Sequence, residues 1–140
     1  RETKRSIIHV QHCSEEPNSP LAPDTPGVEF KPEAMPIEGE PIFQKTVNSA
    51  FIGTNLEEYL REQSIEYLVI VGLTTDHCVS TSTRMAGNLG FNVQLVSDAT
   101  ATFDKIGPDG KKYSADEIHA VNLASLHNEF CKVVTTNSLI

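Results

Sequence analysis

The sequence predicts an α/β protein, a three-layer α/β/α sandwich around a mostly parallel, Rossmann-like sheet. Two observations lead to this fold class. From residue 67 onward, short apolar runs alternate with helical segments, an order that builds right-handed βαβ units. The run at residues 67–73 is apolar almost throughout, which is typical of a strand covered on both faces of a parallel sheet. The length of 140 residues suits one domain, so residues 1–140 are predicted to form a single domain.

The strands of the predicted sheet are short apolar runs. In chain order they are residues 6–10, 41–45 (a weaker candidate), 67–73, 91–96 and 131–135. Residues 11–42 carry seven of the eight prolines and almost no periodicity. Because loops of that length are usually functional or mobile, we expect a long surface loop there.

Three helices are predicted between the strands. Thr54 and Glu57 form a capping-box pattern that opens the first, and Ser114 and Glu117 form another that opens the last. The middle helix is expected over residues 76–90, because a glycine at its end is a common stop signal. The pattern of strand, helix and strand thus continues to the end of the chain.

Composition excludes several function classes. The net charge is −8, and the longest basic run is two lysines, so neither a nucleic-acid partner nor a membrane surface is expected. No apolar stretch approaches the roughly 20 residues that span a bilayer, and the first residues lack the apolar segment of a signal peptide. A cytoplasmic location is the simplest interpretation.

The three cysteines, Cys13, Cys78 and Cys131, are irregularly spaced, which is neither a disulfide framework nor a metal-binding CxxC pattern. His9 and His12 lie near Cys13, but on a strand these two histidines point to opposite faces. We therefore predict no metal site, and no other cofactor is indicated.

One segment carries a candidate nucleophile. Residues 71–79, with the sequence VGLTTDHCV, lead from a buried strand through a turn into a helix that Thr75 or Asp76 can cap. Cys78 then lies in or beside the first helical turn, where unpaired N–H groups and the positive dipole end favour a thiolate. On spacing alone, a small buried hydrophobe is the more common role for such a cysteine.

A resemblance favours the nucleophile. The sequence GLTTDHCVSTSTRMAGNLGF at residues 72–91, continuing to VSDAT at residues 96–100, resembles the signature of the isochorismatase-like cysteine hydrolases. QKTVNSAFIGTNL at residues 44–56 resembles the lysine block of the same family in order and spacing. The resemblance extends from about residue 6 to residue 135.

The resemblance implies roles for individual residues. Cys78 corresponds to the nucleophile, and Lys45 corresponds to a catalytic lysine, whose charge would lower the pKa of the thiol. The bond between Leu73 and Thr74 matches a cis peptide, and the N–H groups of Thr74 and Cys78 match the oxyanion hole. Phe51 and Phe103 are candidates for a substrate pocket, with core packing as the alternative for each.

The family's third catalytic residue is an aspartate at the end of its first strand. Nothing before residue 6 supplies that strand, and Asp24 lies in the proline-rich segment, so it is not the match. We therefore expect the N-terminal first strand and its aspartate outside residues 1–140. That strand should fill a slot between the strands that start at residues 6 and 67.

The predicted function is hydrolysis of a small amide, a C–N bond, through a cysteine nucleophile and an acyl-thioester intermediate. The partner is then a small-molecule substrate, and the resemblance implies a homodimer or homotetramer. Two alternatives stay open. In the first, the chain is a catalytically inactive family member that binds a small molecule or a partner. In the second, it is a redox thiol protein. The absence of a second cysteine near Cys78 in the sequence argues against the redox alternative.

Overall fold

The structure, a computed structural model, describes Arg1 and residues 5–139. The chain divides into two compact units, Arg1–Tyr59 and Leu60–Ile140. The single domain expected from the sequence stays a prediction. Among the described residues, no helix is long and apolar enough to cross a bilayer.

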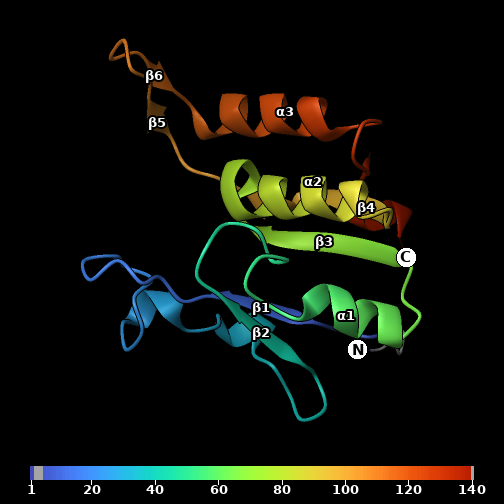
Figure 1. The fold of residues 1–140 in the computed structure, drawn as a ribbon. Helices are drawn as coiled ribbons and strands as arrows, with labels where there is room; N and C mark the ends of the chain where they lie inside the picture. Colours follow the sequence, from blue (N-terminus) through green and yellow to red (C-terminus); the bar gives the residue numbers. More distant parts are fainter. Residues whose placement is uncertain (2–4, 140) are drawn as a thin grey trace. The chain divides into compact units, whose positions relative to one another are not determined.

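The first unit is built on two parallel strands, β1 (His9–His12) and β2 (Ile42–Lys45), which pair in register from end to end (Figure 1). The weaker strand candidate at residues 41–45 is thus confirmed. The predicted strand at residues 6–10 is displaced, because pairing with β2 fixes the position of β1 and the apolar character of residues 6–8 does not.

The long segment between β1 and β2 contains short 3₁₀ turns at Pro26–Val28 and Pro32–Ala34 and no longer helix. Near its end, the Glu40 carboxylate accepts hydrogen bonds from the guanidinium of Arg1 and contacts Nε2 of His9 at 2.7 Å. The hydrogen bonds from Arg1 hold the pKa of Glu40 well below its usual range. The segment is therefore fastened to β1 through the contact between Glu40 and His9.

The second unit contains a parallel sheet with the order β3-β4-β7 and two main helices. The elements are β3 (Tyr67–Leu73), α2 (Ser80–Asn88), β4 (Asn92–Ala101), α3 (Ala115–Leu126) and β7 (Lys132–Val134). The two helices contact each other, and both contact β4 (Figure 1). The core between helices and sheet includes Ala86, Leu95 and Leu126, none of them accessible to solvent. The predicted α/β sandwich with a mostly parallel sheet is confirmed.

The edges of this sheet differ from the prediction in two respects. First, β4 runs to Ala101, past the predicted end at residue 96, and its pairing with β3 shifts register between Ile70 and Gly72 of β3. Second, alternate residues of β3 are exposed, including Val71 and Leu73. Cover on both faces of β3 is therefore wrong for the described chain, in which β3 pairs with β4 alone. The strand expected between those that start at residues 6 and 67 stays a prediction.

The helix starts agree with their sequence signals to different degrees. Ser114 and Glu117 form the predicted capping box at the start of α3. The first helix, α1 (Leu56–Glu62), begins where Thr54 Oγ1 accepts a hydrogen bond from the Leu56 N–H at 3.3 Å. The middle helix was predicted from residue 76, but it opens with a π-helical turn, Thr75–Val79, ahead of α2.

A small hairpin between β4 and α3 was not predicted from the sequence. It consists of two strands of two residues each, β5 (Lys105–Ile106) and β6 (Lys112–Tyr113), paired antiparallel. Gly110, with φ of +79°, supports the turn between them. Runs of two residues carry no periodicity, so the sequence pattern showed only the turn.

Candidate active site

Cys78 lies in the turn that connects β3 to α2. The peptide bond between Leu73 and Thr74 is cis, which agrees with the resemblance. The π-helical turn runs directly into α2, so the half-buried Cys78 lies in the first turn of one continuous helical segment. The N–H groups of His77 and Val79 both donate to the Thr74 carbonyl at 3.2 Å, which tightens this turn around the cysteine.

Two polar side chains beside Cys78 fasten this turn to the rest of the second unit. Thr75 is fully buried, and its hydroxyl lies 2.8 Å from Nδ1 of His119 on α3. The carboxylate of Asp76 is 8% exposed, accepts a hydrogen bond from the Thr102 hydroxyl, and lies 3.1 Å from Nζ of Lys105. The cysteine turn is therefore held by α3 on one side and by the segment after β4 on the other.

The role predicted for Thr75 and Asp76 as helix caps is wrong. The capping position is Thr74, whose side chain makes no capping hydrogen bond. Burial alone would raise the pKa of Asp76, but the hydrogen bonds from Thr102 and Lys105 outweigh burial and lower it to about 2. Asp76 is therefore ionised at neutral pH and acts as an anchor.

A small cavity of about 170 Å³ lies at the carboxyl ends of β3 and β4. Its lining residues are Gly72, Leu73, Asp98, Ala99, Thr100 and Ala101. Ligands of parallel sheets bind beyond the carboxyl ends of the strands, and Leu73 is also the residue at which the chain turns toward Cys78. The Asp98 carboxylate on β4 accepts hydrogen bonds from the N–H and hydroxyl of Thr136, which follows β7. These hydrogen bonds lower the pKa of Asp98.

Lys45 is the last residue of β2, and its side chain is almost fully buried, with 4% of the residue exposed. Its Nζ lies 2.9 Å from Nδ1 of His12, the last residue of β1, and donates to the Val47 carbonyl at 2.9 Å. Burial, followed by the charge of Lys45, lowers the pKa of His12. The imidazole is therefore neutral beside the lysine at neutral pH.

Comparison with known proteins identifies the family. The family profile described as Isochorismatase domain matches residues 1–138. This chain belongs to the isochorismatase family. YrdC of Bacillus subtilis (strain 168), an isochorismatase family protein, is 49% identical over 140 residues, 100% of this chain and 75% of YrdC. A crystal structure of an isochorismatase family protein from Chromobacterium violaceum has a TM-score of 0.90 and 48% identity, covering 94% of this chain and 68% of that chain.

The isochorismatase family includes amidohydrolases. The ureidoacrylate amidohydrolase RutB of Agrobacterium fabrum is 32% identical over 107 residues, which cover 74% of this chain and 45% of RutB. This relative supports hydrolase chemistry for the family. The substrate in its name is that of RutB and is not assigned to this chain.

The residues of the predicted site are divided between the two units. Thr74 and Cys78 lie in one turn of the second unit, whereas Lys45 belongs to the first unit. Phe51 is half-buried in the first unit, and Phe103 is 65% exposed in the second. Neither phenylalanine lines the small cavity described above. The roles assigned to these residues stay predictions.

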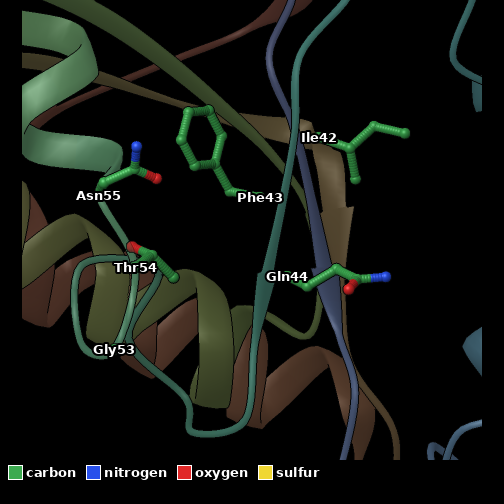
Figure 2. Close-up of a pocket in the computed structure, with 6 residues that line it drawn as sticks. All are labelled: Ile42, Phe43, Gln44, Gly53, Thr54 and Asn55. Atoms are coloured by element: carbon green, nitrogen blue, oxygen red, sulfur yellow. The ribbon is translucent and has the colours of Figure 1, made fainter.

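A larger cavity, of about 570 Å³, lies in the first unit beside β2. Its lining residues are Ile42, Phe43, Gln44, Gly53, Thr54 and Asn55. Figure 2 shows Ile42 and Gln44 on one side of the strand, with Phe43 and Asn55 on the other. Phe51 is not among the residues that line it, and the substrate pocket stays a prediction.

The candidate metal ligands at β1 have other partners. His9 contacts Glu40, and His12 contacts Lys45. Among the described residues, no group of three or more His, Cys, Asp or Glu side chains is arranged to hold a metal ion.

Four polar residues around the two predicted catalytic side chains were not predicted as their partners. They are His12 beside Lys45, and His119, Thr102 and Lys105 around the cysteine turn. His12 was not marked as a partner of Lys45, because the predicted strand ended at residue 10 and only the structure extends β1 to His12. The other three lie 26 or more residues from their partners, and no local pattern marks them.

Proposed function

We propose that this isochorismatase family member hydrolyses a small amide through Cys78. The observation that carries the proposal is the position of Cys78 in the first turn of a helical segment at the carboxyl end of β3. Backbone N–H groups at a helix start stabilise both a thiolate and the oxyanion that forms when sulfur attacks a carbonyl. The amidohydrolase among the relatives supports the same reaction class.

The reaction has two steps. The Cys78 thiolate forms a bond to the amide carbonyl carbon, and the oxyanion is held by the N–H groups of Thr74 and Cys78. The C–N bond then breaks, the amine leaves with a proton, and an acyl-thioester remains. Water attacks the thioester, the C–S bond breaks, and a carboxylic acid is released. The net reaction converts an amide and water into an acid and an amine.

The remaining roles rest on the family resemblance. Lys45 supplies a positive charge that stabilises the thiolate form of the nucleophile. An aspartate outside residues 1–140 accepts the thiol proton and passes it to the leaving amine, as general acid–base catalysis requires. Phe51 and Phe103 remain candidates for contacts with the acyl group.

Trapping the intermediate tests the proposal. The full-length protein is incubated with a panel of small amides, quenched in acid and analysed by mass spectrometry with peptide mapping. We expect an acyl adduct on the peptide that contains Cys78, and the same adduct in a Cys13→Ala control. If no amide is turned over or yields an adduct, while panel members raise the melting temperature, the binding-module alternative replaces the proposal.

A second test uses thiol reactivity. Brief treatment with iodoacetamide near neutral pH should alkylate Cys78 ahead of Cys13 and Cys131. Cys131 is buried, and burial raises the pKa of its thiol. Equal labelling of the three cysteines, or protection of Cys78 alone, would contradict its assignment as the nucleophile.

A further inference from the structure

Two side chains meet where the strands of the first unit end. His12 is the last residue of β1, and Lys45 is the last residue of β2. The two are register partners in a parallel pair, so their side chains project from the same face of the ladder. Nδ1 of His12 and Nζ of Lys45 are 2.9 Å apart. The contact thus follows directly from the strand register.

The chemistry of the two groups fixes the direction of this hydrogen bond. A lysine ammonium has three N–H donors and no acceptor, so Nδ1 of His12 must accept. The imidazole is then neutral and carries its proton on Nε2. The Val47 carbonyl accepts a second N–H of the same ammonium at 2.9 Å. Two acceptors in fixed positions leave the ammonium little freedom to rotate.

We propose that His12 is a positioning residue that aims the Lys45 ammonium by accepting one of its hydrogen bonds. The inference rests on the proposed function, in which Lys45 is catalytic. In this role His12 acts through Lys45 and does not contact the substrate. Protonation of His12 removes the acceptor and places a second positive charge beside the ammonium. Lys45 is then displaced, and activity falls on the acid side.

The other charged groups near the end of β1 do not replace Lys45 as the partner of His12. Glu40, the carboxylate of this region, contacts Nε2 of His9 at 2.7 Å. Cys13 follows His12 in the chain and is half-buried. In the described part of the first unit, the charged group in hydrogen-bond contact with His12 is therefore Lys45 on β2.

Two substitutions separate positioning from packing. In His12→Asn, the side-chain oxygen takes the place of Nδ1 as an acceptor but does not titrate. In His12→Phe, the ring volume is kept and the acceptor is lost. We expect His12→Asn to keep kcat within about threefold near pH 8 and to lose the part of the acid limb that His12 contributes. We expect His12→Phe to lower kcat at least tenfold with little change in KM.

His127 offers a matched control in the second unit, because its Nδ1 also accepts a hydrogen bond, from the Val133 N–H at 3.0 Å. His127→Asn should leave both kcat and the pH profile unchanged. Equal kcat and equal acid limbs in wild type and His12→Phe would overturn the inference. A His12→Asn variant as impaired as His12→Phe would also overturn it.

A readout without substrate separates this inference from the proposed function. In ¹⁵N-histidine spectra of the full-length protein, Nδ1 of His12 should be unprotonated at neutral pH, and Lys45→Met should raise the pKa of His12. A protonated Nδ1 at neutral pH overturns the inference whatever the activity. An unprotonated Nδ1 in a protein that hydrolyses none of the amides shows that the proposed function has failed, and the catalytic role of His12 with it.

Discussion

Lys45 of the first unit and Cys78 of the second unit are positioned by different means. Lys45 is placed by the backbone, because the ladder between β1 and β2 sets it against His12. Cys78 is placed by side chains, since Thr75 reaches α3 and Asp76 reaches the segment after β4. A shift of one residue in strand register would move Lys45 to the other face, whereas the cysteine turn depends on polar contacts that can be removed singly.

This difference has a consequence for substitutions. A substitution at His12 or Lys45 is expected to alter the orientation or the charge of the ammonium group, while the ladder between β1 and β2 persists. On the cysteine side, removing an anchor leaves a half-buried partner without its hydrogen bond, which costs stability as well as activity.

The largest effect is expected from Cys78→Ala, which removes the attacking atom. Its kcat should fall about a thousandfold or more, with an unfolding midpoint close to that of wild type, because the side chain is half-buried and small. Steady-state kinetics and urea unfolding of the full-length protein measure both. Cys13→Ala is the matched control and should keep its activity. A Cys78→Ala variant that retains a tenth of the activity would exclude the thioester pathway.

The next effect concerns the anchor beside the cysteine. Asp76→Asn keeps the shape of the side chain but removes the charge that holds Lys105 at 3.1 Å. We expect a loss of about 1–3 kcal/mol in the free energy of unfolding. We also expect a drop of about tenfold in kcat, because the turn that carries Cys78 loosens. Urea unfolding and kinetics test the two parts separately.

Asp109→Asn is the control for charge, since Asp109 is exposed in the β5–β6 turn and should change neither quantity. If Asp76→Asn lowers stability and leaves kcat unchanged, the anchor supports the fold and not the nucleophile. The contrast between the two sides of the site would then be lost.

A feature of the fold could be predicted where its signal lies in a short stretch of sequence, and could not where it depends on residues far apart in the chain. The bounds of β3 and the capping box at Ser114 were predicted correctly, because an apolar run and a short polar pattern carry their own signals. The displacement of β1 and the extension of β4 were not, since each depends on pairing with another strand. The π-helical start at Thr75 has no pattern that differs from an ordinary helix start.

The site shows the same division. Cys78 and Lys45 were singled out because their flanking sequences resemble family blocks, and the structure places each at the end of a parallel strand or just beyond it. Their polar partners were missed. Lys105 meets Asp76, and His119 meets Thr75, only after the chain has folded, so no spacing in the sequence could indicate these pairs.

A smaller effect should appear in the pH dependence of stability. The pKa of Asp76 is lowered from 3.8 to about 2 in the folded protein. A carboxyl group with a lowered folded pKa stabilises the fold above its unfolded pKa, and this contribution is lost as the pH falls through the folded value. The loss therefore lies between about pH 4 and pH 2. It amounts to at most about 2 kcal/mol and less where solvent screens the pair.

Unfolding free energies of wild type and Asp76→Asn at several pH values measure this contribution. The difference between the two proteins should shrink as the pH falls from 4 to 2, since wild type then loses the charge that the variant lacks. A constant difference over this interval would mean that the pKa of Asp76 is not lowered in the folded protein.

The smallest effect is expected at the start of α3, the helix that carries His119 to the buried Thr75. The Ser114 hydroxyl accepts a hydrogen bond from the Glu117 N–H at 3.2 Å, and the Glu117 carboxylate accepts from the Ser114 N–H at 2.8 Å. Ser114→Ala removes the first bond and should cost about 1 kcal/mol of stability. Because His119 lies one helical turn further along, we expect kcat to change less than twofold. Ser114→Asp, which restores a capping acceptor, should recover most of the stability. A fall in kcat of more than threefold in Ser114→Ala, reversed in Ser114→Asp, would show that the cysteine turn depends on the whole helix and not on the single contact between Thr75 and His119.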